Sequence, residues 1–134
     1  MSFRIPDEKL IELASLFLET KDVKENNWTE CCFVFKFGEG HVSNSGYLYD
    51  GDEVIPAIAK IDAYPVLLGD KLLELRELIY SECGHKFIQL LFQMENKTKR
   101  FKIDFEFDDP KRWAITPCNM FEMRERLKPV FDKE

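Results

Sequence analysis

The sequence predicts an α+β fold, in which an antiparallel β-sheet of four or more strands packs against helices that lie mainly on one of its faces. Three observations predict it. Helical periodicity occurs near both ends and in the middle of the chain, alternating apolar patterns occur in two pairs of segments, and short polar turns join each pair. Such short turns connect antiparallel strands. The expected order is α-β-β-α-β-β-α, within one domain that spans residues 1–134.

An amphipathic helix is the first expected element, from Asp7 to Leu18. Pro6 and Asp7 are typical of a helix start. Apolar residues recur at the spacing i, i+3, i+4 and i+7, which places them on one helical face. They are Leu10, Leu13, Ala14 and Phe17. This face needs an apolar partner, which we expect to be the sheet.

Two strands follow, joined by the tight turn Gly38-Glu39-Gly40. The first spans residues 28–37 and reads WTECCFVFKF, and the second returns from His41 to Tyr49. Alternate residues of the first strand share an apolar face, namely Cys31, Phe33, Phe35 and Phe37. Residues 50–65 combine a turn signal with two prolines in a short apolar stretch, so the sequence leaves their structure open.

The longest expected helix runs from Leu68 to Cys83, with Gly84 as its C-cap. Its core stripe consists of Leu68, Leu72, Leu75 and Ile79. A second pair of strands should follow at residues 86–95 and 99–108, joined by a polar turn at residues 95–98. The inward residues of the first of these strands are Ile88, Leu90, Phe92 and Met94.

A last helix is expected from about Pro117 to Leu127. Thr116 is a suitable N-cap, and a proline in the first turn fits a helix start. The residues that would pack this segment are Met120, Met123, Leu127 and Val130 or Phe131.

Composition narrows the function classes. The chain has 134 residues, 45% of them hydrophobic, which suits a folded domain with a real core. Its net charge of −6 argues against direct, sequence-independent binding of nucleic acid, which rests on lysine and arginine. The N-terminus lacks a secretory signal and no segment is apolar enough to span a membrane, so we expect a cytoplasmic protein. Four cysteines without a C-x-x-C pattern should be reduced thiols.

Residues 101–109 carry the main functional signal. Phe101, Ile103, Phe105 and Phe107 alternate at the period of a strand and should face the core. Asp104, Glu106 and Asp108 occupy the opposite face, and Asp109 closes the strand. A basic partner would find complementary charge there. The alternative is structural, because a strand with one solvated face needs polar residues on that face.

Catalytic motifs are missing from the sequence. No nucleophile elbow, zinc-protease motif, Walker motif or dinucleotide-binding motif occurs, so we expect no enzyme activity and no cofactor. One enzyme hypothesis stays open: the carboxylates of Asp104, Glu106 and Asp108 could hold Mg²⁺ in a metal-dependent nuclease. Against it, alternate strand residues stand about 7 Å apart, and the negative net charge opposes binding of a phosphate backbone.

The stretch FKIDFEFDD at residues 101–109 resembles the late strand, of the form F-x-I-D-[FY]-x-[FY]-D-D, of the YezG-like immunity proteins of bacterial polymorphic-toxin and contact-dependent inhibition systems. The element order over residues 10–109 is similar as well. The family tail commonly carries an arginine pair and then a tryptophan. Here Arg112 and Trp113 can be matched loosely, and the proline-capped helix after them departs from the pattern.

The resemblance implies a cytoplasmic immunity protein that binds and neutralises a cognate toxin domain, often a basic nuclease. The implied partner-binding residues are Asp104, Glu106, Asp108, Asp109, Arg112 and Trp113. A non-catalytic scaffold or adaptor domain is the other alternative. The identity of the toxin, the face that docks and the oligomeric state are not determined by the sequence.

Overall fold

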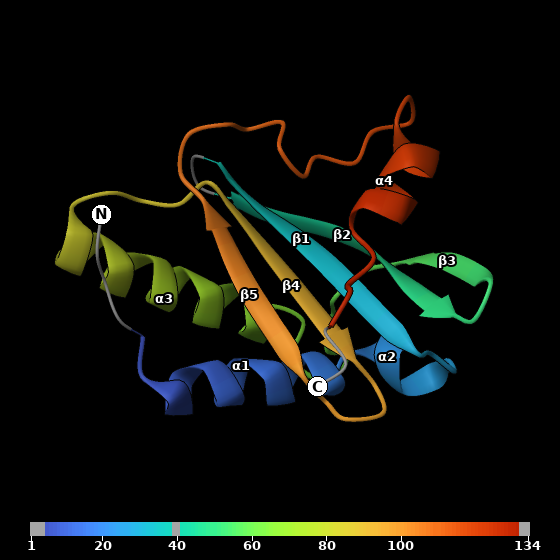
Figure 1. The fold of residues 1–134 in the computed structure, drawn as a ribbon. Coiled ribbons are helices and arrows are strands. Elements are labelled where there is room, and N and C mark those ends of the chain that lie inside the picture. Colours follow the sequence, from blue (N-terminus) through green and yellow to red (C-terminus); the bar gives the residue numbers. More distant parts are fainter. Residues whose placement is uncertain (1–4, 39–40, 132–134) are drawn as a thin grey trace.

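Five antiparallel strands form one sheet in the order β3-β2-β1-β4-β5 across the part of the chain that this computed structural model describes, residues 5–38 and 41–131 (Figure 1). The strands are β1 (Glu30–Gly38), β2 (His41–Asp50), β3 (Glu53–Ala57), β4 (Gln89–Glu95) and β5 (Phe101–Glu106). The helices are α1 (Asp7–Leu18), α2 (Lys21–Glu25), α3 (Leu67–Cys83) and α4 (Met120–Arg126). The α+β class and the antiparallel sheet are confirmed, but the order is α-α-β-β-β-α-β-β-α.

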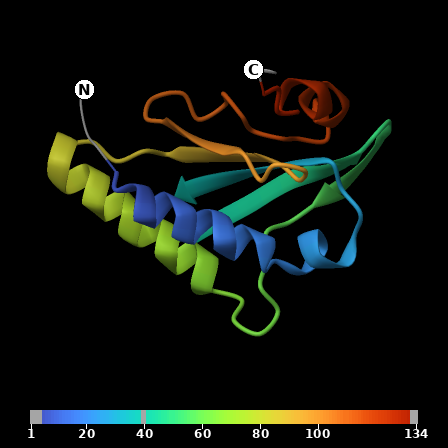
Figure 2. The same ribbon diagram turned by 60° about the horizontal axis from the view of Figure 1, so that its bottom comes forward.

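The first core lies between the sheet and the helices α1 and α3, which Figure 2 shows on the same side of it. Phe17 of α1 stacks on Phe92 of β4 with ring centroids 3.9 Å apart, and it also contacts Phe33 and Phe35 of β1. The predicted α3 stripe is buried as expected: Leu68, Leu72, Leu75 and Ile79. Gly84 ends α3 with a φ of 79°, a left-handed conformation that favours glycine.

A second core lies on the opposite face of the sheet, beneath α4 and the segment that leads to it. It consists of Cys32, Val34, Tyr47, Tyr49, Leu91, Trp113, Met123 and Leu127. The helices therefore lie mainly on one face, as predicted, with α4 on the other. The run from Cys31 to Phe35 is buried without a break because β1 is covered on both sides.

Hydrogen bonds attach α4 to this face. The hydroxyls of Tyr47 and Tyr49 donate to the carbonyls of Met120 and Arg124, at 2.7 and 2.6 Å. Beyond the helix, the Gln93 side-chain amide donates to the Leu127 carbonyl at 2.8 Å. Polar side chains in the middle of the sheet thus have hydrogen-bond partners in the C-terminal segment. These bonds satisfy both the side-chain donors of the sheet and the backbone carbonyls of that segment.

The predicted start of the last helix is wrong. The helix begins at Met120, after Asn119 and not after Thr116. The Asn119 side chain accepts a hydrogen bond from the Thr116 N–H at 2.7 Å and donates to the Ala114 carbonyl at 3.0 Å. Because the Asn119 side chain bonds to backbone groups that a helix would otherwise use, residues before Met120 form a local turn instead of a helix.

Residues 50–65, whose structure the sequence leaves open, form a hairpin and then a loop. Gly51 has a φ of 63° at the first central position of the two-residue turn, which is typical of a type II′ hairpin. The returning strand is β3, an edge strand that contains Pro56. The unpredicted helix α2 supports this region, since the Asp22 carboxylate accepts the Ile58 N–H at 2.9 Å.

The second hairpin is shorter than predicted. β4 begins at Gln89 instead of Lys86, and β5 ends at Glu106 instead of Asp108. The Ile88 N–H donates to the Glu106 carbonyl at 2.7 Å, which produces a β-bulge where β5 ends. Of the predicted glycine turn, residues 39 and 40 lie outside the described residues. None of the helices in residues 5–38 and 41–131 has the length and hydropathy needed to cross a membrane.

Candidate functional site

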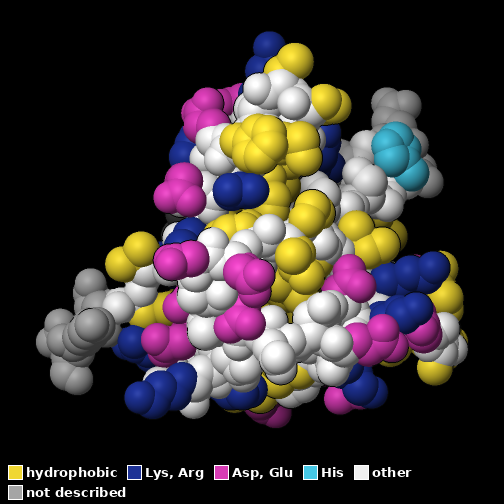
Figure 3. All heavy atoms as spheres, turned by 90° about the vertical axis from the view of Figure 1, so that its right-hand side faces the viewer, with side chains coloured by type: hydrophobic (Ala, Val, Ile, Leu, Met, Phe, Trp, Pro, Cys, Tyr) yellow, Lys and Arg dark blue, Asp and Glu magenta, His cyan; other side chains and the backbone are white. Residues whose placement is uncertain are grey.

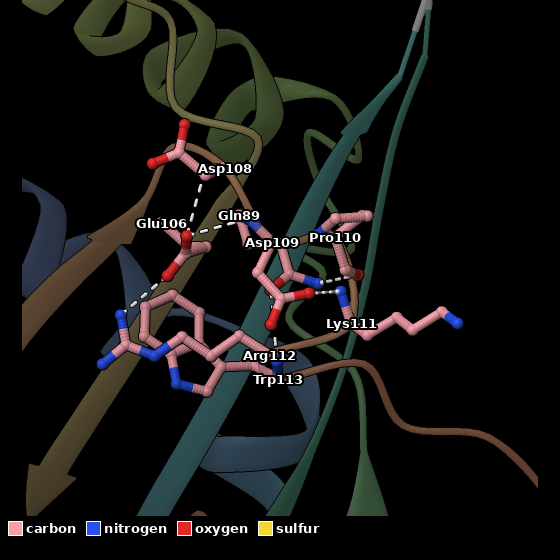
Figure 4. Close-up of polar contacts among 8 residues, drawn as sticks. All are labelled: Gln89, Glu106, Asp108, Asp109, Pro110, Lys111, Arg112 and Trp113. Carbon is pink, nitrogen blue, oxygen red and sulfur yellow. Dashed lines mark hydrogen bonds and ion pairs between the residues drawn. The ribbon is translucent and has the colours of Figure 1, made fainter.

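The predicted acidic residues gather at the end of β5 and in the turn that follows it, shown in Figure 4. Asp104 is exposed on β5, on the sheet face that also carries α4. Asp108 and Asp109 are exposed in the turn beyond the strand. The continuous carboxylate stripe expected along one strand is therefore divided between a strand and a turn.

Glu106 differs from these three carboxylates, because its side chain is only 13% exposed and is held by three donors. One oxygen accepts the backbone N–H groups of Asp108 and Asp109, at 3.0 and 2.9 Å. The other accepts from the Arg112 guanidinium at 2.8 Å. Hydrogen bonds from the Asp109 backbone and from Arg112, together with that of Asp108, lower the pKa of Glu106 to about 2. This residue organises the turn and presents little charge to solvent.

Gln89 anchors the same turn from beneath. It is 1% exposed and lies opposite Glu106 in the β4–β5 register. Its side-chain nitrogen donates to the Pro110 carbonyl at 2.9 Å, and its oxygen accepts the Trp113 N–H at 3.2 Å. Both ends of a buried amide are therefore used to fix the path of residues 110–113 across the sheet.

Asp109 adds a local bond within the turn. Its carboxylate accepts the Lys111 N–H at 2.9 Å, and its backbone carbonyl accepts the Arg112 N–H at 3.3 Å. An aspartate that bonds the backbone two residues ahead is typical of a tight turn. Asp108 and Asp109 thus project from a turn with a defined conformation.

Arg112 and Trp113, the two residues matched to the family tail, lie in different environments. The side chain of Arg112 is half exposed and its guanidinium lies 4.6 Å from the Trp113 ring centroid. Trp113 itself is 6% exposed and belongs to the second core. The structure pairs Arg112 with Glu106, but it places the tryptophan ring inside the fold, where a docking partner would reach little of it.

A metal centre has no support in the described residues. Residues 5–38 and 41–131 contain no group of three or more His, Cys, Asp or Glu side chains that could hold an ion. Glu106, a proposed ligand in the nuclease hypothesis, is already paired with Arg112. The hypothesis therefore lacks the convergent carboxylates that a divalent cation requires.

The surface also has a groove of about 510 Å³ between α3 and β2, lined by both apolar and polar residues. Phe35, Val42 and Leu73 are among its lining residues. Arg76 lies at the groove with its Nε atom donating to the Phe87 carbonyl at 2.7 Å. The described residues that line it include no serine or cysteine, and its polar lining residues include His41, Asn44 and Asp70.

An exposed apolar area lies on the β3 side of the molecule. Figure 3 shows hydrophobic side chains gathered in the middle of this side, with carboxylates below them. Phe121 of α4 is 70% exposed and Ile55 of β3 is 42% exposed. Polar residues such as Asp50 and Glu53 lie beside Ile55, so this surface is of mixed character.

No protein-family model matches this chain, and a search of the curated proteins finds no match. The resemblance to the YezG-like immunity proteins therefore stays a prediction that rests on residues 101–109 and on element order. The sequence did not indicate Gln89 or the role of Glu106, because a buried glutamine within an apolar strand carries no local signal for the turn it will bind.

Proposed function

We propose that this protein is an immunity protein, which binds and neutralises a cognate toxin domain through the acidic surface formed by Asp104, Asp108 and Asp109. The observation that carries the proposal is the contrast among the four carboxylates. Glu106 is used internally, and the other three are exposed. The bonds that Glu106 accepts also fix the backbone that displays Asp108 and Asp109.

A held turn favours binding because less conformational entropy is lost when the partner docks. Arg112 neutralises Glu106, and Lys111 is an exposed base beside the turn. The three exposed aspartates therefore set the local negative charge. A nuclease toxin must be basic where it grips phosphates, and such a surface attracts exposed carboxylates and accelerates association.

The resemblance described above supports the same class of function, and so does the net charge of −6. Trp113 takes a smaller part in this proposal than the sequence suggests. Its ring supports the turn from the second core, and Arg112 extends over it toward solvent. We assign Arg112 to the rim of the binding surface and Trp113 to its support.

The experiment uses the reading frame next to this gene as the source of the toxin. Its product is expressed in bacterial cells with or without this protein, and growth is measured. Wild-type protein should restore growth. Asp108→Lys combined with Asp109→Lys should lose protection, because like charges then face the toxin and affinity falls by about 100-fold or more.

The matched control is Glu74→Lys combined with Glu82→Lys. These exposed residues lie on α3, on the other side of the sheet, and the substitutions make the same change in net charge. The control should protect fully. Full protection by a folded Asp108→Lys, Asp109→Lys variant would contradict the proposed surface, and a neighbouring product that is not toxic would remove support for the function.

A further inference from the structure

The two edges of the sheet differ in whether another strand can pair with them. β3 forms one edge and β5 the other. In the β2–β3 hairpin, Asp50 pairs with Glu53 across the two-residue turn, so hydrogen-bonded pairs alternate from there and Pro56 falls at an outward-facing position. Proline has no N–H to offer, and Pro56 therefore blunts the β3 edge.

The β5 edge has no proline and offers its backbone groups at Ile103. The Glu95 N–H donates to the Arg100 carbonyl at 2.9 Å, which identifies that pair as a hydrogen-bonded one. Pairs alternate along the ladder, so Lys102 and Asp104 bond to β4, whereas the N–H and carbonyl of Ile103 point away from it. The described part of the chain places no other backbone partner at Ile103.

The side chains around Ile103 are complementary to those of a second, antiparallel copy of the same strand. Lys102 and Asp104 are exposed, have opposite charge and lie on the same face of the strand. In residues 5–38 and 41–131, neither side chain forms an ion pair. Ile103 faces the opposite side and is half-buried, which leaves part of its apolar surface in water.

These features select one partner among the strands that could pair with β5. An antiparallel second copy with Ile103 opposite Ile103 places Lys102 of each copy opposite Asp104 of the other. In this register the outward-facing N–H and carbonyl of Ile103 in one copy meet those of Ile103 in the other, so the two residues exchange two hydrogen bonds. A uniformly basic strand would instead place a like charge opposite Lys102.

We propose that the protein forms a two-fold symmetric dimer in which the β5 strands pair antiparallel around Ile103, joining two five-stranded sheets into one continuous sheet. The contact is isologous, because the same three residues of each copy meet. This dimer goes beyond the proposed toxin binding and does not depend on it. Asp104 belongs to both surfaces, but Asp108 and Asp109, the two residues changed in the toxin experiment, lie outside the paired strand.

The test is the dimer dissociation constant, measured by sedimentation equilibrium up to about 100 µM, where a specific edge pairing should be populated. Lys102→Asp and Asp104→Lys should each raise this constant roughly tenfold or more, because two opposite-charge pairs become like-charge pairs in the symmetric contact. Combining the two substitutions exchanges the charges and should restore the dimer. Lys97→Asp, an exposed change outside β5, is the control and should have little effect.

Ile103→Pro provides the backbone test. An edge position whose backbone faces outward tolerates proline, and Pro56 occupies such a position in β3. A thermal melt checks that the variant folds. The variant should be monomeric. A wild-type protein that is monomeric at about 100 µM would overturn the proposal, and the charges would then merely protect the edge. A dimer that tolerates both single charge changes, or that the double change does not restore, would overturn it equally.

Discussion

Trp113→Ala separates two roles for this residue: the binding contact that the family resemblance implies, and the core residue that the structure shows. The ring is 6% exposed and packs in the second core. A buried aromatic side chain removes about 200 Å² from water, and at about 25 cal/mol/Å² this amounts to an upper value of about 5 kcal/mol. Substitutions of this kind lose about 3–5 kcal/mol once the remaining cavity is included. We expect a loss of that size here.

The assay is equilibrium unfolding in urea, with a thermal melt in parallel. The expected loss corresponds to a fall in Tm of roughly 10–20 °C for a domain of this size. Phe121→Ala is the matched control, since this aromatic residue belongs to the same C-terminal segment but is 70% exposed. It should change stability by less than about 0.5 kcal/mol. Equal, small losses for both variants would refute the second core as a source of stability.

Two further predictions concern ionisable groups. The pKa of Glu106 is about 2, below its ordinary value of 4.5, so the stability that its ionised form contributes is complete above about pH 4.5 and is lost as the pH falls toward 2. The urea midpoints of wild type and Glu106→Gln should therefore converge over this range. A constant difference between the two midpoints would contradict this role of Glu106. Burial raises the pKa of the Cys31 thiol and raises that of Cys32 to about 12. A thiol reagent should therefore modify exposed Cys118 first, and Cys31 and Cys32 only when the protein unfolds. Rapid labelling of Cys32 in the folded protein would contradict its burial in the second core.

The sequence predicts those elements whose apolar residues recur on a single face, which packs against one partner. The helix from Asp7 to Leu18 and the helix that ends before Gly84 follow this rule, and both lie where expected. The second core was not predicted, because Cys32 and Val34 fill the polar positions of an alternating strand with apolar residues. Their partners, Met123 and Leu127, lie about ninety residues away in the chain.

The site illustrates the same limit. Alternation places Asp104 on an exposed face, and the structure agrees. It cannot show that Glu106 ends the strand, because that depends on the bulge at Ile88 and on the bond to Arg112. Nor does it show the burial of Trp113, which depends on hydrogen bonds from the turn to Gln89.

The central claim is that the exposed aspartates on β5 and in the turn beyond it bind a basic toxin. The most direct measurement is the salt dependence of that binding. The association rate with the product of the neighbouring reading frame should fall steeply as ionic strength rises. Asp108→Lys with Asp109→Lys should reduce both the low-salt rate and its salt dependence, whereas Glu74→Lys with Glu82→Lys should change them much less. A tight complex whose rate is independent of salt, or equally affected by both variants, would contradict the claim.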